Sequence, residues 1–303
     1  MQLKILEEII EELRIPFKNE ERIDSYTTIG IGGPCIKMLF PQEEKQLIKI
    51  LKYLEKTHIP YFILGGGSNL LAGDKGYEGI IIHFPSYKGF EIEKENKNEV
   101  VLKAKAGTKV SEILTYTVKE GLSGFEFLAG LPATVGGIIK MNAGAFGKSV
   151  SEIVKEITLY FKGKTFKIKS TPELWNYREF KKEGIVLSAS FKLKIDTPYG
   201  VKERIKNYLK KRKETQPISK KTFGSVFKNP PGNYAGKLID LCGLKGYQIG
   251  DAQISKKHAN FIVNLGKAKA EEVLELIKLA QKKVYEKFKI QLEPEVKFLG
   301  CGV

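Results

Sequence analysis

A glycine-rich segment near residue 65 has residue types that can hold a phosphate group. Gly65-Gly-Gly-Ser-Asn69 follows the short apolar run Tyr61–Leu64, which predicts a strand. Glycines let backbone N–H groups approach an anion closely, and the Ser and Asn side chains add hydrogen-bond donors. The segment is neither a P-loop nor a dinucleotide-binding turn, because no Gly-Lys-Ser/Thr and no G-x-G-x-x-G pattern occurs in it. By itself it predicts either a phosphate contact or a sharp turn.

Two further segments share this character. Leu128–Gly137 continues to Asn142-Ala-Gly-Ala145, and small residues dominate both stretches. A flexible linker would be more polar, whereas an apolar chain of Gly and Ala allows a flat ligand or another backbone to come close. The third segment is Tyr26–Pro34, with the sequence Y-T-T-I-G-I-G-G-P. Three such segments in the first half of the chain favour a large nucleotide-type ligand.

The elements that must position these segments mix helices with short strands. Apolar residues at helical spacing predict helices over 42–57, 109–120, 201–214 and 270–288. Strands are predicted over 61–64, 100–106, 185–195 and 290–299, with a hairpin over 153–169 around Gly163. In the last strand we expect Leu292, Val296 and Phe298 to face one way and Glu293, Glu295 and Lys297 the other. The composition changes near 197–201, so we expect an α+β protein with a domain boundary there.

The composition excludes several classes of protein. The chain has 303 residues, 42% of them hydrophobic, which is enough for a buried core. No apolar run reaches the roughly 18 residues that a membrane span needs. The segment from Met1 to Leu13 has helical spacing and lacks the pattern of a signal peptide, so we expect a cytoplasmic protein. Three scattered cysteines and three distant histidines predict neither a disulfide framework nor a metal site.

The positive charge allows several interpretations. The chain has 51 basic and 35 acidic residues and a net charge of +16, with a dense lysine run from Lys202 to Lys221. That run is typical of a solvated helix face, but it also fits nucleic-acid binding or attraction of small anions.

Seven motifs in a fixed order resemble one family over nearly the whole chain. T-T-I-G-I-G-G-P, L-G-G-G-S-N-L-L, A-G-L-P-A-T-V-G-G and N-A-G-A-F-G are followed by Y-R-E-F, G-S-V-F-K-N-P and L-E-P-E-V. The set closely resembles the UDP-N-acetylenolpyruvoylglucosamine reductase family, flavoenzymes of peptidoglycan synthesis and hence of cell-wall biogenesis, cell shape and cell division. The stretch between Arg178 and Ser225 is too short for the tyrosine-bearing insertion of one class, so the chain is similar to the shorter class.

The resemblance implies a domain organisation and a set of ligands. Residues 1–197 would form an FAD-binding domain of the vanillyl-alcohol-oxidase type, in two lobes of about 1–82 and 83–197. Residues 198–303 would form a smaller α+β substrate-binding domain, with a catalytic Glu on the last strand, about 290–300. FAD would be bound without a covalent link, and NADPH would be the reductant. We expect a monomer without nucleic-acid or membrane partners.

The resemblance also implies the residues that act. Arg178, Ser225 and Glu295 would be catalytic. The Arg178 cation would stabilise a substrate carboxylate on which negative charge develops. The Ser225 hydroxyl, near positive charge, would protonate a carbanion-like enolate. The Glu295 carboxyl, near an anionic substrate, would stay protonated and donate a hydrogen bond. Without the resemblance, Arg178 fits a surface ion pair with Glu179 or Glu183. Ser225 fits the cap of a turn, and Glu295 fits an ordinary exposed strand position.

The FAD contacts implied by the resemblance are small or polar residues of the glycine-rich segments: Gly65, Gly66, Gly67, Ser68, Asn69, Leu70, Ala129, Gly130, Pro132, Thr134, Gly136, Gly137 and Asn142. The implied contacts to the sugar nucleotide are Tyr177, Arg212, Lys228, Asn229 and His258. His258 fits an ordinary surface histidine equally well.

Two rival hypotheses remain at this point. Another flavoprotein of the same fold would often tether its flavin through His or Cys; no His lies in or beside the segments 65–70 and 129–145, although Cys35 follows the third segment. A lysine-rich nucleic-acid-binding protein would show clustered cations with exposed aromatic side chains and would not need the small-residue segments.

Overall fold

The computed structural model describes residues 2–302, and these fold into two compact units. Within the described residues, the first unit comprises 2–19, 37–66 and 79–209, and the second comprises 20–36, 67–78 and 210–302. Met1, part of the segment with predicted helical spacing, lies outside the described residues. Neither unit is continuous in sequence, and both contain parts of the N-terminal third of the chain. The functional boundary expected near residue 197 stays a prediction.

Seven α-helices occur among residues 2–302. They are α1 (Gln2–Glu12), α2 (Glu44–Thr57), α3 (Val110–Glu120), α4 (Val135–Lys140), α5 (Pro198–Thr215), α6 (Ala235–Leu241) and α7 (Ala270–Phe288). The helices predicted from apolar spacing are confirmed, and α7 has the predicted bounds. Helix α5 begins three residues before the predicted start at 201, at Pro198, because proline is tolerated in the first turn of a helix. The six-residue helix α4 was not predicted.

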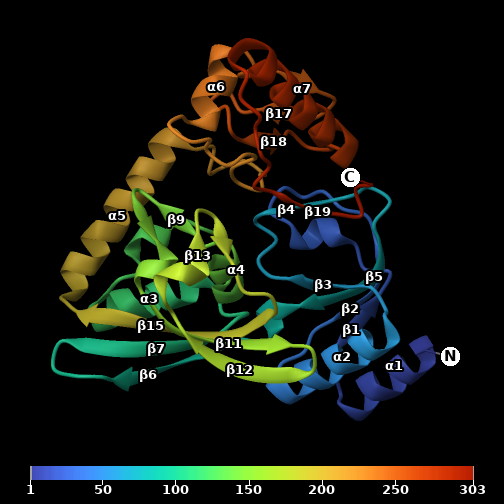
Figure 1. Cartoon of the computed structure of the whole chain (residues 1–303), viewed down its shortest axis with the longest axis vertical. Helices are drawn as coiled ribbons and strands as arrows, with labels where there is room; N and C mark the ends of the chain where they lie inside the picture. Colours follow the sequence, from blue (N-terminus) through green and yellow to red (C-terminus); the bar gives the residue numbers. More distant parts are fainter. Residues whose placement is uncertain (1, 303) are drawn as a thin grey trace. The chain divides into compact units, whose positions relative to one another are not determined.

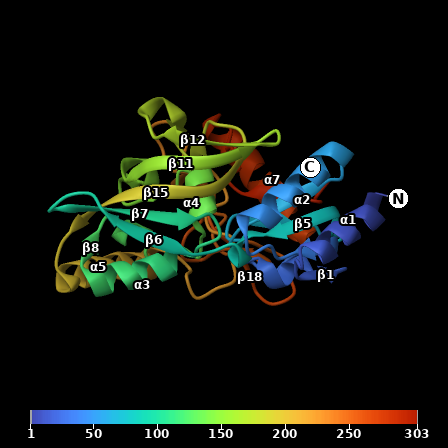
Figure 2. The ribbon, with the colours of Figure 1, turned by 90° about the horizontal axis from the view of Figure 1, so that it is seen from below.

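The first unit contains two sheets. The first sheet has the order β1 (Phe17–Asn19), β2 (Cys35–Leu39), β5 (Tyr77–His83), β3 (Tyr61–Leu64), and Figure 1 shows α1 and α2 beside it. The larger sheet has the order β12 (Lys164–Lys169), β11 (Val154–Phe161), β15 (Ile185–Ile195), β7 (Glu99–Lys105), β6 (Phe90–Lys94), which Figure 2 shows strand by strand, with β8 (Leu122–Ser123) also on β15. The predicted hairpin over 153–169 is confirmed as β11 and β12.

One hydrophobic core runs through the first unit. It joins α2 residues such as Leu47 and Leu51 to Leu102 of β7 and Phe191 of β15. Two short hairpins lie beside the larger sheet. They pair β9 (Gly144–Ala145) with β10 (Lys148–Ser149) and β13 (Trp175–Asn176) with β14 (Glu179–Phe180). The first hairpin begins two residues after Asn142, and Arg178 lies in the turn of the second hairpin.

The second unit packs α6 and α7 with a small sheet of β16 (Gln248–Ile249), β17 (Ala252–Ile254) and β18 (Ile262–Asn264). Its core takes Val273, Ile277 and Val284 from the predicted apolar face of α7. A parallel pair joins β4 (Leu70–Ala72) to β19 (Lys297–Leu299), and this pair brings the first glycine-rich segment next to the C-terminal segment.

The prediction of a strand over 290–299 is wrong for its first seven residues. Only Lys297–Leu299 forms a strand, while Pro294 makes an isolated bridge to Phe227. Proline has no N–H to donate to a ladder, and the Leu292 carbonyl instead accepts a bond of 2.9 Å from the Gln281 side chain of α7. The expected alternation of burial still holds for Leu292, Glu293 and Val296. Glu295 therefore precedes the last strand rather than lying on it.

Candidate functional site

Two of the glycine-rich segments meet in the first unit. A Cβ atom on Gly65 would lie 2.8 Å from Oγ1 of Thr134, and one on Gly66 would lie 2.5 Å from the carbonyl oxygen of Pro132. A side chain at residue 66 would therefore require the backbone to move, and one at residue 65 would require the Thr134 hydroxyl to move. The loop after β3 therefore packs directly on the segment that leads into α4.

The geometry of this loop fits the pyrophosphate expected there. The N–H groups of Gly65 and Gly66 donate no hydrogen bond to any atom of residues 2–302. Unsatisfied backbone donors flanked by small residues suit an anion, because an N–H group without a partner is costly unless water or a ligand accepts from it. Residues 133–136 are held by three backbone bonds of 2.8–3.0 Å to residues 106–110, so the opposite wall is rigid.

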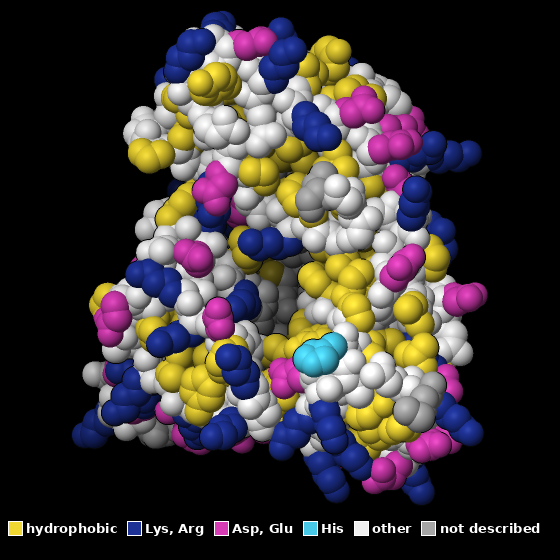
Figure 3. Space-filling model, turned by 45° about the vertical axis from the view of Figure 1, so that its right-hand side comes forward, with side chains coloured by type: hydrophobic (Ala, Val, Ile, Leu, Met, Phe, Trp, Pro, Cys, Tyr) yellow, Lys and Arg dark blue, Asp and Glu magenta, His cyan; other side chains and the backbone are white. Residues whose placement is uncertain are grey.

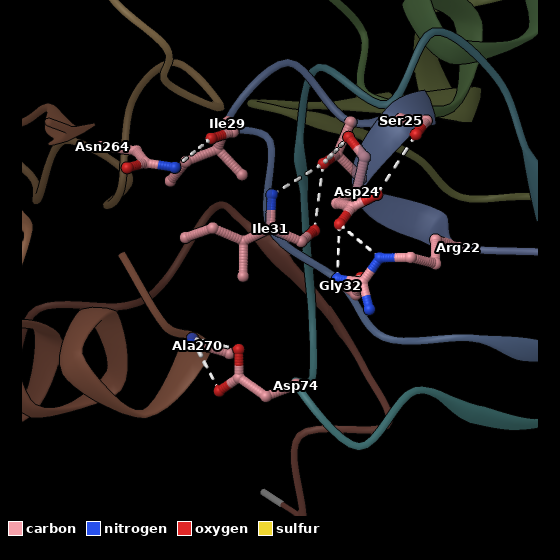
Figure 4. Close-up of polar contacts among 10 residues, drawn as sticks. Arg22, Asp24, Ser25, Ile29, Ile31, Gly32, Asp74, Asn264 and Ala270 are labelled. Atoms are coloured by element: carbon pink, nitrogen blue, oxygen red, sulfur yellow. Dashed lines mark hydrogen bonds and ion pairs between the residues drawn. The ribbon is translucent and has the colours of Figure 1, made fainter. Parts of the chain in front are cut away.

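The rest of the loop lies in the second unit, on the third glycine-rich segment. Gly67 has φ +61°, and a Cβ atom there would lie 1.9 Å from the carbonyl oxygen of Tyr26. Thr28 donates its backbone N–H to the Gly67 carbonyl at 3.1 Å and its hydroxyl to the Thr222 carbonyl at 2.7 Å. Asn264 donates to the carbonyl of Ile29 at 3.0 Å, as Figure 4 shows. Segment 26–34 thus connects the glycine loop to the segment that carries Ser225.

The second unit brings the predicted catalytic residues Ser225 and Glu295 close together. The Glu295 N–H donates to the carbonyl of Val226, the residue after Ser225, at 2.8 Å. Asn69 donates its side-chain amide to the Glu295 carbonyl at 3.1 Å. Ser225 and Glu295 are both half-buried, whereas the side chain of the neighbouring Glu293 is 67% exposed. Glu295, the predicted catalytic residue, is therefore more buried than Glu293.

Arg178 lies at the tip of the β13–β14 hairpin in the first unit. Its φ is +60°, in the left-handed region that a residue with a Cβ rarely occupies. Its Nη1 donates to the Gly144 carbonyl at 2.8 Å, and its guanidinium lies 5.3 Å from the ring centroid of Tyr177. Arg14, which lies outside the motifs, also has a positive φ (51°), so this conformation by itself assigns no function to Arg178.

Asn142 attaches this hairpin to the second glycine-rich segment. Its side-chain amide donates to the Asn176 carbonyl at 2.9 Å, and its side-chain oxygen accepts from the Ser151 N–H at 3.3 Å. The residue is 8% exposed. In the first unit, the predicted FAD contact Asn142 and the predicted catalytic Arg178 are therefore parts of one hydrogen-bonded structure.

The predicted nucleotide contacts in the second unit already have protein partners. Lys228 forms an ion pair with Glu293, and the Asn229 side chain accepts from the Ala235 N–H at 3.0 Å at the start of α6. Arg212 is 4% exposed and donates to the Gln216 side chain at 3.1 Å. An anionic ligand would have to compete with Glu293 for Lys228.

His258 is half-buried and not an ordinary surface histidine. Its Nδ1 accepts from the Asn260 N–H at 3.2 Å, and its ring lies 4.9 Å from that of Phe261. Burial, and next the charge of Lys245, lower the pKa of His258. The ring is therefore neutral at pH 7, with Nε2–H as its remaining donor.

Positive charge is distributed rather than concentrated on the visible surface. Figure 3 shows lysine and arginine side chains scattered over the face in view. In the second unit, Lys213, Lys220, Lys256 and Lys257 line a cavity of about 840 Å³ together with glutamine, serine and apolar side chains. The dense lysine run thus contributes to a concave surface as well as to an exposed helix.

Comparison with known proteins decides the family. Residues 216–299 match the model of the UDP-N-acetylenolpyruvoylglucosamine reductase C-terminal domain, and residues 37–165 match that of an FAD-binding domain. A UDP-N-acetylenolpyruvoylglucosamine reductase from Caldicellulosiruptor saccharolyticus is 39% identical over 96% of this chain and 94% of its own length. A reductase of the same name from Caldanaerobacter subterraneus subsp. tengcongensis is 39% identical over 97% of this chain and 97% of its own length. The chain belongs to the UDP-N-acetylenolpyruvoylglucosamine reductase family.

A solved member of the reductase family shares the fold. The crystal structure of UDP-N-acetylenolpyruvylglucosamine reductase from Thermus caldophilus is 35% identical, covers 94% of this chain and 99% of its own, and superposes with a TM-score of 0.76. The predicted family, the α+β class and FAD as cofactor are confirmed. The chain is an FAD oxidoreductase of this family. NADPH and the individual site residues stay predictions.

Sequence reasoning missed two buried asparagines of the second unit that bond the segments of the predicted site residues. Asn260 and Asn264 are 4% and 5% exposed and bond segments far away in the sequence. Their only signal is that each asparagine borders the strand-like apolar run Phe261–Val263. A buried amide needs partners, but the sequence does not say which backbone supplies them.

Two features are absent from the described part of the chain. Among residues 2–302, no helix is long and apolar enough to cross a membrane. Within the same residues, no cluster of His, Cys, Asp or Glu could hold a metal ion.

Proposed function

We propose that this chain reduces the enolpyruvyl group of UDP-N-acetylglucosamine enolpyruvate to UDP-N-acetylmuramate in peptidoglycan precursor synthesis, with NADPH as reductant. The observation that carries the proposal is the backbone hydrogen bond from Glu295 to Val226, the residue after Ser225, together with the bond from Asn69 of the glycine loop to the Glu295 carbonyl. Membership of the reductase family supports it. Residues 1–197 would bind FAD and 198–303 the sugar nucleotide.

Bound FAD would supply hydride chemistry, and Gly65 to Leu70 with residues 129–142 would hold it. Arg178 would bind the substrate carboxylate, because a guanidinium stays charged and matches a carboxylate with two parallel donors. Charge that spreads into this carboxylate as the carbon–carbon double bond is reduced would be stabilised there. The left-handed conformation of Arg178 and its bond to Gly144 restrict the guanidinium before substrate arrives.

Ser225 would donate the proton that completes the reduction at carbon. Glu295, half-buried beside it, would donate a hydrogen bond to the substrate when protonated. Lys228 is three residues from Ser225 and would supply positive charge when a ligand displaces Glu293. Each ligand is anionic, so the net charge of +16 would attract them all.

The test separates the two halves of the reaction by flavin absorbance in stopped flow. Ser225→Ala should bind FAD and be reduced by NADPH at nearly the parental rate. Its reoxidation by the enolpyruvyl substrate should slow by about 10²–10⁴, the usual effect of losing a general acid. Ser225→Cys should retain more activity than Ser225→Ala, and Ser111→Ala, on the exposed side of α3, should behave as the parent.

Parental reoxidation by Ser225→Ala would remove the proton-donor role. A protein that takes up no FAD, or that NADPH cannot reduce, would remove the proposed function itself. We also infer that the enzyme acts as a monomer in the cytoplasm, and sedimentation of the purified protein tests the first of these statements.

A further inference from the structure

The side chain of Asn260 pairs with the backbone of Phe227 in the second unit. Its Oδ1 accepts from the Phe227 N–H at 3.0 Å, and its Nδ2 donates to the Phe227 carbonyl at 2.8 Å. Asn260 is 4% exposed and Phe227 is 2% exposed. The amide thus satisfies both polar backbone groups of one buried residue, as a neighbouring strand would do.

The backbone of Asn260 extends the same contact in both directions. Its carbonyl accepts from the Val226 N–H at 2.9 Å, and its N–H donates to Nδ1 of His258 at 3.2 Å. One residue therefore fixes two consecutive residues after Ser225 and also the tautomer of His258.

The opposite edge of this segment carries Glu295. The Glu295 N–H donates to the Val226 carbonyl at 2.8 Å, and the Lys228 N–H donates to the Glu293 carbonyl at 2.9 Å. These two bonds flank the Phe227–Pro294 pair, so the N–H and the carbonyl of Phe227 point away from Pro294, and the Asn260 side chain is their partner. The three segments form no regular strands here, and isolated bridges join Ser225 to Phe261 and Phe227 to Pro294.

We infer that Asn260 is a positioning residue, which holds segment 225–228 so that Ser225 and Glu295 keep their mutual register. The inference rests on the proposed function of those two residues. Loss of the amide leaves the N–H and the carbonyl of Phe227 buried without partners, and the segment must move to satisfy them. A displacement of about 1 Å at reacting groups can slow a reaction about 100-fold.

The first test compares Asn260→Ala with the parent, both loaded with FAD. Reduction by NADPH should stay within about twofold of the parent, while reoxidation by the enolpyruvyl substrate should slow about 10- to 100-fold. Amide hydrogen exchange at Phe227 should become faster in the variant, a readout that does not depend on activity. Asp251→Ala is the control, because its side chain accepts from the Lys267 N–H in the same unit and does not bond segment 225–228.

A second variant, Asn260→Asp, gives a pH signature. An ionised carboxylate can accept from the Phe227 N–H but cannot donate to the Phe227 carbonyl, whereas the protonated carboxyl can do both. Its reoxidation rate relative to the parent should therefore rise as pH falls, while the ratio for Asn260→Ala stays flat. The nearby titratable groups His258, Lys245, Lys228, Glu293 and Glu295 occur in parent and variants alike, so the ratio cancels their effects.

The outcomes separate two kinds of failure. If the parental holoenzyme is reduced by NADPH but not reoxidised by the substrate, the proposed function is wrong and the inference ends with it. If the parent turns over and Asn260→Ala reoxidises at the parental rate, or slows equally in both halves, only the inference is overturned. If Asn260→Ala does not fold, the pH dependence of Asn260→Asp decides, and a flat ratio overturns the inference.

Discussion

The residue just before helix α7 cannot accept hydrogen bonds from the first N–H groups of the helix, and Asp74 accepts them instead. The residue before the helix is Lys269, whose side chain has no acceptor for the first N–H groups. The Asp74 carboxylate accepts from the Ala270 N–H with both oxygens, at 3.0 and 2.9 Å, and from the Glu271 N–H at 3.4 Å. Figure 4 shows this contact, which joins positions 196 residues apart.

Asp74→Ala should destabilise the protein by a predictable amount. Loss of a helix N-cap acceptor costs about 1 kcal/mol, and loss of a negative charge at the helix N-terminus costs about 0.5 kcal/mol at an exposed position. Together these give about 1.5 kcal/mol. For a chain of this size the melting temperature should fall by about 3 °C.

Thermal unfolding of the FAD-loaded protein, followed by far-ultraviolet circular dichroism, is the assay. Asp74→Asn keeps an oxygen acceptor and should lose only the charge contribution, about a third of the effect of Asp74→Ala. Lys75→Ala, at the exposed neighbouring residue, is the control and should melt within 1 °C of the parent, as surface substitutions typically do. A melting temperature of Asp74→Ala equal to that of Lys75→Ala would refute the assigned capping role.

Three further predictions address the cofactor, the chemistry and pH. Gly66→Ala should lower the FAD content per chain several-fold, because its Cβ would lie 2.5 Å from the Pro132 carbonyl; a parental flavin-to-protein absorbance ratio would contradict this. Arg178→Ala should keep its FAD but lose about 10²–10³ in kcat; a raised KM with parental kcat would instead show uniform binding. Burial, and next Lys109 and Lys18, lower the pKa of His83 to about 4 from 6.5, so protonation favours the unfolded chain and stability is lost as pH falls from about 6.5 towards 4. His83→Leu should reduce the acid-induced loss in the free energy of unfolding by on the order of 3 kcal/mol, measured by urea unfolding at several pH values. If the free energy of unfolding of the variant falls with pH as steeply as that of the parent, His83 is not the group responsible.

Much of the local structure was predictable from the order of residues. The apolar spacing of α7 and the apolar run of β15 predict both elements with their observed bounds, because each element buries one regular face or run of side chains. The strand over 290–299 was predicted by the same rule and is wrong for 290–296, because burial alternates there without a continuous ladder and Pro294 makes an isolated bridge to Phe227. Helix α4 was missed because six residues rich in glycine carry no measurable period.

The candidate site was also predictable only in part. Its motifs are local, so the glycine-rich segments, the Tyr177–Phe180 turn and the Ser225 segment were recognised in the sequence, and comparison confirms the family they indicate. The partners of those motifs are not local. Nothing in the sequence indicates that Asn142 bonds Asn176.

By itself, the sequence determined several of the longer helices and strands, the family, and the cofactor class, because periodicity and motifs act over a few neighbouring residues. Only the tertiary structure decided that Asp74 caps α7 and that Asn260 pairs with Phe227. A buried polar group must find a partner, but any backbone brought within about 3 Å can serve, and packing of the whole chain selects which one does.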